Sequence, residues 1–156
     1  AKTLFPYTTL FRSILNAFAE WEAWAESLAV QSKDPLEKLV MPMRLFVRLN
    51  KTHPHHAQTL VNYFAVVARI VPQLQVKLIG HVTALNKAKL LKIDNPAAAA
   101  RHFHAVITFA VIEQVTNPKA TEKDADESVF AALALFGIPE TQAKKLAFAP
   151  LPKLTK

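Results

Sequence analysis

Only two glycines, Gly80 and Gly137, occur among the 156 residues, and this scarcity limits what the chain can fold into. Dinucleotide-binding turns, phosphate-cradling loops and the nucleophile elbow of hydrolases all need glycines, because the backbone there approaches a ligand closely or takes a positive φ. The sequence therefore excludes these three kinds of site.

Apolar residues recur with helical spacing along almost the whole chain, and prolines stand where helices would begin. The clearest start is Asp34-Pro35-Leu36-Glu37, which supplies an N-cap, a proline at the first helical position and an acid at the capping-box position. We predict an all-α fold, an antiparallel helical bundle of about six to seven helices. The predicted helices are Ile14–Gln31, Pro35–Asn50, Thr52–Ile70, Pro72–Leu91, Pro96–Val115, Asp124–Phe136, which Gly137 would cap, and Pro139–Phe148.

The fifth and sixth of these helices carry apolar residues nearly all round their axes, so each must be covered on more than one side. Either both are central helices of a monomer, or one side packs against a second copy of the chain. We expect the second arrangement, a homodimer with a four-helix interface. His102 and His104 lie two residues apart on a helix and therefore point in nearly opposite directions, which is consistent with one of them at this interface. The predicted interface residues are His102, Ala105, Phe109, Ile112, Ala132, Leu133 and Phe136.

The sequence offers little to catalysis or metal binding. It has no cysteine, which leaves no disulfide framework or thiolate nucleophile and favours a cytoplasmic protein. We interpret the histidine cluster at 53, 55 and 56 as a capping, exposed turn rather than a zinc site, because no acid lies nearby in sequence. No Ser, His and acid arrangement can be assembled. We expect no enzyme activity, no metal and no cofactor, and the apolar stretches are too short for a membrane span.

Charge is unevenly distributed. No Asp or Glu occurs from Lys38 through Ile93, although the chain as a whole carries a net charge of +7. Such a basic block could attract phosphate or an anionic effector beneath Arg44 or Arg48. A solvated basic face is the more common arrangement, because no exposed aromatic residues alternate with the basic ones.

Residues Thr3 to Ser13, TLFPYTTLFRS, look like the in-frame translation of a sequencing-adapter oligonucleotide. The alternative is a natural β-prone segment, but no second strand candidate exists to pair with it. We therefore interpret residues 1–13 as a non-native segment and expect a domain upstream of them to be missing. The predicted helical domain covers residues 14–149, and residues 150–156 form a basic tail.

The order of elements resembles the C-terminal ligand-binding and dimerisation domain of Tet-repressor-like (TetR family) transcriptional regulators. The resemblance rests on the Asp34-Pro35-Leu36-Glu37 start, on Asn95-Pro96 followed by alanines and a long apolar helix, and on a helix ending in Leu135-Phe136-Gly137. The helix-turn-helix by which this family is recognised is absent from the sequence. The resemblance therefore implies a regulator truncated upstream of its connecting helix, Ile14–Gln31.

The family resemblance implies a homodimeric repressor in which a small apolar or amphipathic effector changes the spacing of two DNA-reading heads. DNA would be bound only through the missing N-terminal domain. One alternative is a non-sensing helical interaction module, with a packed interior in place of a cavity. Another is an enzyme, for which His81 and His104 are the candidates. The predicted ligand-binding residues are Trp21, Trp24, Met43, Phe46, Tyr63, Phe64, Phe103, His104 and Ile107.

Overall fold

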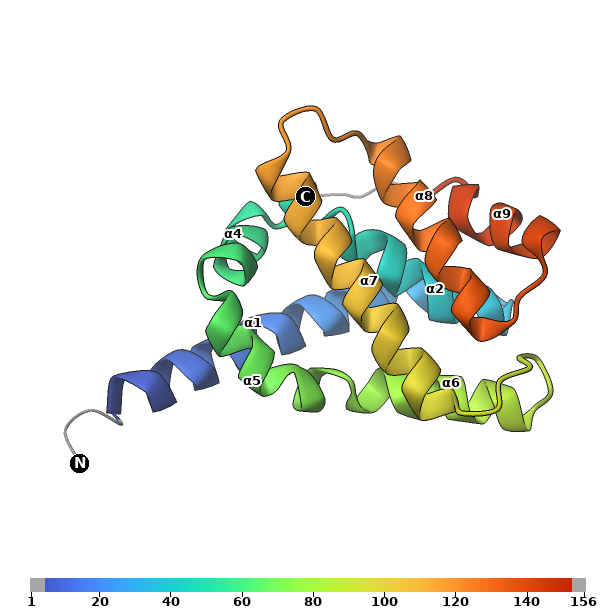
Figure 1. Cartoon of the computed structure of the whole chain (residues 1–156), viewed down its shortest axis with the longest axis horizontal. Helices are drawn as coiled ribbons and strands as arrows, with labels where there is room; N and C mark the ends of the chain where they lie inside the picture. Colours follow the sequence, from blue (N-terminus) through green and yellow to red (C-terminus); the bar gives the residue numbers. More distant parts are fainter. Residues whose placement is uncertain (1–4, 153–156) are drawn as a thin grey trace.

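A computed structural model describes residues 5–152, and every regular element in that range is a helix (Figure 1). This confirms the predicted all-α helical bundle. No helix among these residues is both long and apolar enough to cross a bilayer. The elements are α1 (Phe5–Ala29), α2 (Pro35–Phe46), α3 (Leu49–Thr52), α4 (Pro54–Asn62), α5 (Phe64–Leu74), α6 (Val76–Lys87), α7 (Pro96–Thr116), α8 (Glu122–Leu133), the 3₁₀ turn η1 (Ala134–Phe136) and α9 (Glu140–Phe148).

Local capping explains where the best-predicted helices begin. Asp34 accepts a hydrogen bond from the backbone N–H of Leu36 at 2.8 Å, and Pro35 occupies the first turn of α2. Asn95 caps α7 in the same way. At α8, Thr121 and Asp124 form a reciprocal capping box, so that helix begins at Glu122, before the predicted Asp124.

The middle of the chain differs from the prediction. The predicted helix Thr52–Ile70 is broken at Tyr63, whose φ of −116° and ψ of 29° are not helical, and α5 starts after it. Pro72 does not begin a helix but lies inside α5, and the next helix starts at Val76. The predicted second helix ends early, at Phe46, after Pro42 has removed one hydrogen bond of its ladder.

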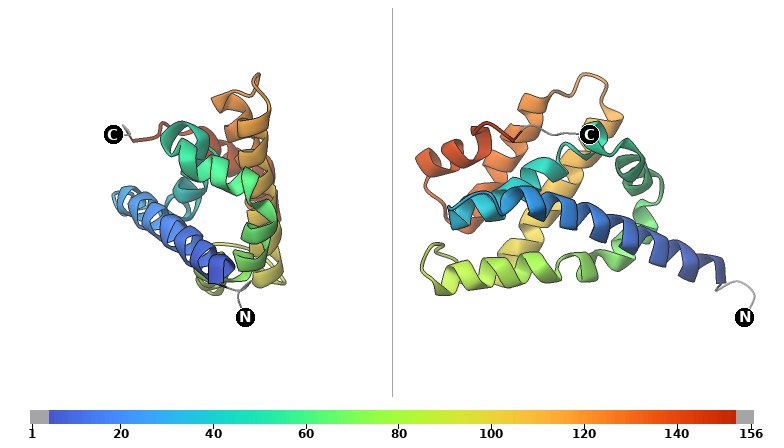
Figure 2. Two further views of the ribbon diagram at one scale, coloured as in Figure 1. Left: turned by 90° about the vertical axis from the view of Figure 1, so that its left-hand side faces the viewer. Right: turned by 180° about the vertical axis from the view of Figure 1, so that it is seen from behind.

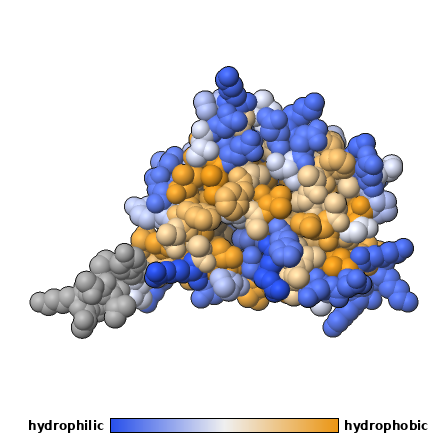
Figure 3. Space-filling model, in the orientation of Figure 1, coloured by the Kyte–Doolittle hydropathy of each residue, from blue (hydrophilic) through white to orange (hydrophobic). Residues whose placement is uncertain are grey.

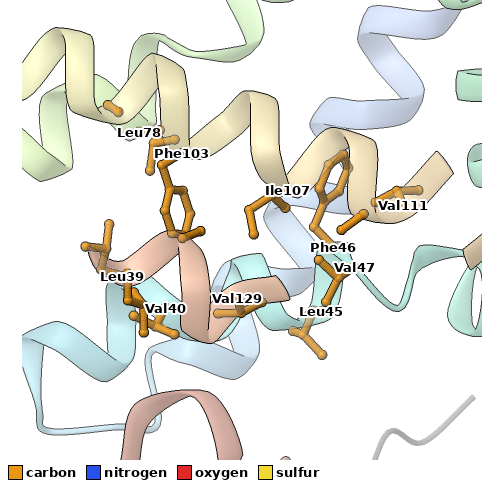
Figure 4. Packing of buried hydrophobic residues seen from close by; sticks show 14 of the residues in the cluster. Leu39, Val40, Leu45, Phe46, Val47, Leu78, Phe103, Ile107, Val111 and Val129 are labelled. Atoms are coloured by element: carbon orange, nitrogen blue, oxygen red, sulfur yellow. The ribbon is translucent and has the colours of Figure 1, made fainter. Parts of the chain in front are cut away.

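The centre of the core is the inward face of α7. Phe103, Ile107 and Val111 are fully buried and face side chains from α2 and α8 (Figure 4). The ring of Phe103 also stacks on Phe136, with centroids 4.5 Å apart. The opposite face of α7 has no helix of this chain over it in Figure 1. One helix therefore supplies both the core and a surface of the protomer.

Gly137 ends η1 in the left-handed conformation, with φ of 65°, as the sequence predicts for a helix cap. A Cβ built on Gly137 would lie 2.7 Å from the backbone oxygen of Lys92, in the loop between α6 and α7. Glycine is therefore required here both by the backbone angle and by the close approach of another segment.

Helix α1 is longer than predicted. It starts at Phe5, with Pro6 in its first turn where a proline is tolerated, and its N-terminal half projects beyond the other helices (Figure 2). Thr3 and Leu4 of the adapter-like segment, and residues 153–156 of the predicted tail, lie outside the described residues. Ile14, Phe18 and Trp21 are buried along one face.

Part of the basic block is neutralised inside the protein. Arg44 and Arg48 are buried, and the carboxylate of Asp126 in α8 lies 3.4 Å from Arg44 Nη2 and 2.7 Å from Arg48 Nη2. Glu122 lies 3.7 Å from Arg48 Nε. The suggestion that Arg44 or Arg48 receives an anionic effector is therefore wrong, because acids from α8, distant in sequence, already pair with both.

Candidate functional site

A cleft of about 320 Å³ lies between α1, α2 and α6. Its walls are mostly apolar, and charged side chains stand at its edge. Helix α6 runs alongside the C-terminal half of α1 in the view from behind (Figure 2). The lining residues are Trp21, Glu22, Glu26, Ala29, Val30, Lys38, Leu39, Pro42, Met43, Lys77, Leu78 and His81.

A smaller chamber of about 70 Å³ adjoins this cleft on the side of α5 and α7. The two spaces have Trp21, Glu22, Met43 and Leu78 as common walls. Because Met43 is unbranched and flexible, movement of its side chain would change the opening between them. The chamber is lined by Phe18, Trp21, Glu22, Met43, Phe46, Leu74, Leu78 and His104.

Three aromatic rings form one wall of the chamber. The Phe46 ring lies 5.1 Å from Trp21 and 6.3 Å from His104, where the two rings are nearly parallel. Trp21 is only 6% exposed, and its indole Nε1 is buried without a hydrogen-bond partner among residues 5–152. A buried donor without a partner carries a desolvation cost of about 1–3 kcal/mol, so this N–H is an unusual feature of an apolar wall.

The protonation of His104 follows from its surroundings. Its Nδ1 lies 3.3 Å from Nε2 of the buried Gln75. An amide nitrogen can only donate, so Nδ1 accepts and the ring proton sits on Nε2. Burial lowers the pKa of His104 and favours this neutral form. His104, which lines the chamber, therefore carries a second N–H group, and no hydrogen bond from its Nε2 to another described residue is present.

Ion pairs connect α1 to α6 across the mouth of the cleft. Lys77 Nζ lies 3.3 Å from a carboxylate oxygen of Glu22 and 3.3 Å from one of Glu26. Although burial opposes the charge, the two carboxylates raise the pKa of Lys77. The Lys77 side chain is 59% exposed, so salt screens these ion pairs. They therefore stabilise the position of α6 relative to α1 only weakly.

The predicted ligand-binding residues divide into two groups. Trp21, Met43, Phe46 and His104 line the cleft or the chamber. The other five lie elsewhere: Trp24 packs against His53, Phe103 and Ile107 are fully buried in the core, and Tyr63 and Phe64 are exposed. The enzyme candidates are likewise separated, since His81 lines only the cleft and His104 only the chamber.

Sequence reasoning missed several walls of the cavity. Phe18 lies three residues before Trp21, and this helical spacing was sufficient to place it on the same face. Leu74 and Leu78 both fall in the predicted helix Pro72–Leu91, but they come from α5 and α6. No sequence pattern indicated that Glu22 lines the cavity, because an acidic side chain on a helix is expected to face solvent.

A second candidate surface lies on the outward face of α7. Phe109 is 62% exposed and Val106 41%, and the Phe109 ring packs edge-on against Phe64 of α5 at 5.9 Å. Apolar residues gather across the centre of this face in Figure 3. A shallow groove of about 690 Å³ here is lined by Ala105, Val106, Phe109, Ala110, Ile112, Glu113, Thr116 and Ser128.

The predicted interface residues also divide. His102, Ala105 and Phe109 are exposed on α7, and Ile112 is partly exposed. Leu133 and Phe136 are fully buried within the protomer and Ala132 is 2% exposed, so these three side chains lack a free surface. The reason is that α8 turns its apolar face inward onto α7 and α9, which covers it without a second copy.

His53 and His56 pack against α1, whereas His55 is exposed, as predicted for the whole cluster. The His53 ring lies 4.7 Å from that of Trp24 and 5.3 Å from that of His56. His56 Nε2 lies 3.2 Å from the backbone oxygen of Ala17. Although His53 is the residue before α4, its side chain makes no capping hydrogen bond. No group of three potential metal ligands occurs among residues 5–152.

This arrangement of helices is a TetR-like fold, which confirms at the level of the fold the resemblance suggested by the sequence. A solved structure that shares it is that of the TetR-family regulator RolR in complex with its ligand resorcinol. The TM-score is 0.79 at 17% sequence identity, and the match covers 96% of this chain and 74% of RolR. No protein-family model matches the sequence, and no curated protein matches it.

Proposed function

We propose that this chain is the effector-sensing and homodimerisation domain of a TetR-like transcriptional repressor whose N-terminal helix-turn-helix is missing from the chain. The proposed domain covers residues 14–149. The match leaves about a quarter of RolR without a counterpart here, which is compatible with a missing DNA-reading segment. The setting for such a protein would be the cytoplasm.

The observation that carries the sensing role is the cleft between α1, α2 and α6, together with its chamber. Its main volume of about 320 Å³ falls in the range of small-molecule sites, and its walls are largely apolar. Trp21 and Glu22 place one wall on α1, the helix that would continue toward the DNA-binding segment. A compound that displaced Trp21 would therefore act directly on the helix that transmits the signal.

The dimerisation role is supported by the outward face of α7. Its exposed rings form a patch that no other part of residues 5–152 covers, and soluble monomers seldom expose such patches without a function. We propose that a second copy covers it through His102, Ala105, Phe109 and Ile112, with Val106 and Phe64 added. The buried Ala132, Leu133 and Phe136 would not contact the second copy, but they belong to α8 and η1, which pack against the inward face of α7.

The sensing role can be tested with purified protein and a panel of small aromatic compounds that includes resorcinol. Binding should change tryptophan fluorescence and raise the melting temperature, because a ligand that binds only the folded state stabilises it. If no compound in a broad panel changes either signal, the chain is a non-sensing interaction module. The small volume of the chamber, about 70 Å³, is the observation that favours that alternative.

The two methionines provide a matched pair of variants. Met43 lines both spaces, whereas Met41 lies in a different groove beside α9. Met43→Ala should enlarge the cavity and shift the preference toward larger aromatic compounds. Met41→Ala should leave the preference unchanged, and equal effects of the two substitutions would argue against a ligand at Met43.

A further inference from the structure

The lining of the chamber selects a chemical class of ligand, an inference that rests on the proposed sensing function. The apolar walls formed by Phe18, Phe46 and Leu74 suit a hydrocarbon ring. A closed cavity of about 150 Å³ is enough for a benzene ring. The chamber alone is smaller than that, so a ring would have to extend past Met43 into the cleft.

Two of the residues that line the chamber, Trp21 and His104, carry an N–H donor. One is the Trp21 indole N–H, which is buried with no partner in the described part of the chain, and the other is the Nε2–H of His104, whose Nδ1 accepts a hydrogen bond from Gln75. Both side chains pack against the same ring, that of Phe46. Because an unsatisfied buried donor is costly, a ligand that brings an oxygen to this wall gains more than a plain hydrocarbon does.

Charge at the chamber is negative rather than positive. Glu22 is the charged residue in its lining, and the carboxylate already shares Lys77 with Glu26 at the mouth of the cleft. Arg44 and Arg48 are paired with Asp126. An anionic group in the chamber would therefore approach a carboxylate, because the two lysines of the cavity, Lys38 and Lys77, line the cleft and not the chamber.

We infer that the cavity binds neutral hydroxyaromatic compounds, with the Trp21 indole N–H and the His104 Nε2–H as donors to a ligand hydroxyl oxygen. A hydroxyl group both accepts and donates, so the same ligand can donate its own proton to the Glu22 carboxylate. A hydrocarbon ring lacks the acceptor, and a carboxylate lacks the proton and carries the wrong charge.

Calorimetry with phenol, toluene and benzoate separates these contributions. Phenol should bind most tightly to the wild-type protein, toluene more weakly, and benzoate weakest. Trp21→Phe keeps a ring but removes the N–H, and it should weaken phenol binding about tenfold while changing toluene binding less than about twofold. Trp24→Phe is the matched control, because Trp24 packs against His53 outside both spaces, and it should change neither affinity.

The Trp24→Phe protein also allows a nuclear magnetic resonance measurement on the unsubstituted Trp21. Its one remaining indole N–H resonance belongs to Trp21, and phenol should shift this resonance downfield whereas toluene should not. Equal losses of phenol and toluene binding in Trp21→Phe, an unmoved indole resonance, or benzoate binding as tight as phenol would overturn the inference. In each of those cases the sensing function would stand. If the wild-type protein binds none of the compounds, both the inferred ligand class and the proposed sensing function would be contradicted.

Discussion

The carboxylate of Asp126 in α8 forms an ion pair with the buried guanidinium of Arg48, the residue before α3, with Oδ2 and Nη2 2.7 Å apart. The same carboxylate also pairs with Arg44 through its other oxygen. Burial lowers the pKa of Arg44, and the negative charge of Asp126 opposes that shift. Asp126 thus stabilises two buried cations. Through Arg44 it also links α2, which lines the cleft, to α8, which packs against α7.

Asp126→Asn keeps the shape of the side chain but removes this charge. We expect the substitution to lower the free energy of unfolding by about 3 kcal/mol, because both guanidiniums remain buried with too little compensation. Urea denaturation followed by circular dichroism measures the loss. Glu127→Gln, at an exposed position of α8, is the control and should change stability by less than about 0.5 kcal/mol. A similar small change in Asp126→Asn would contradict the argument.

Replacing each of the two glycines by alanine should change the stability of the protein in opposite directions. At Gly137 the φ is positive and an added Cβ would lie 2.7 Å from the Lys92 oxygen, so Gly137→Ala should cost about 1–3 kcal/mol. Gly80 lies inside α6 with nothing within 4 Å of a Cβ, so Gly80→Ala should stabilise the protein by up to about 1 kcal/mol. Melting temperatures of the two variants test both signs together.

Stability should fall as the pH falls through about 6.5, the ordinary pKa of histidine. Burial lowers the pKa of His104, so below that pH the unfolded chain binds a proton that the folded chain lacks. Burial and the neighbouring His56 lower the pKa of His53, with the same sign. Urea midpoints at about pH 7.5 and about pH 5.5, on either side of that value, should differ less in His104→Phe than in the wild type. The exposed His102→Gln is the control and should retain the full wild-type difference.

The proposed dimer depends on Phe109. Phe109→Asp places a charge in the centre of the interface and should weaken dimerisation by at least about a hundredfold, while the protomer stays folded because this side chain is 62% exposed. Sedimentation and circular dichroism measure the two properties separately. Val76→Asp, at an exposed position of α6, should leave the dimer intact. A wild-type monomer at tens of micromolar would refute the proposed assembly.

Helix starts could be predicted from the sequence because their chemistry is local. The Asp34 and Asn95 caps each act within three residues of themselves. Breaks inside helices were less predictable. Tyr63 interrupts the helical path without a proline or glycine, and Phe64 consequently reaches the surface beside Phe109 instead of the predicted pocket.

The site was predicted only in part because helical periodicity gives the direction of a side chain but not the helix that it meets. Trp21 and Phe103 have equally regular surroundings in sequence, yet one faces a cavity and the other stacks on Phe136 in the core. The pairing of Arg48 with Asp126 joins positions far apart in the chain, and no spacing rule connects them. The apolar residues all round α7 were sufficient to predict that one of its faces is exposed on the protomer. The burial of α8 could not be predicted in this way, because it depends on the packing of α9 against it.

Helix α1 continues for 16 residues from Trp21 back to Phe5, and its first turns extend beyond the body of the fold (Figure 2). At the helical rise, this stretch of helix is about 24 Å long. A tilt of about 5° at Trp21 would therefore move the far end by about 2 Å. A natural segment that followed the same helical path in place of residues 1–13 would move by a similar distance, although the displacement at Trp21 would be too small to disturb the core.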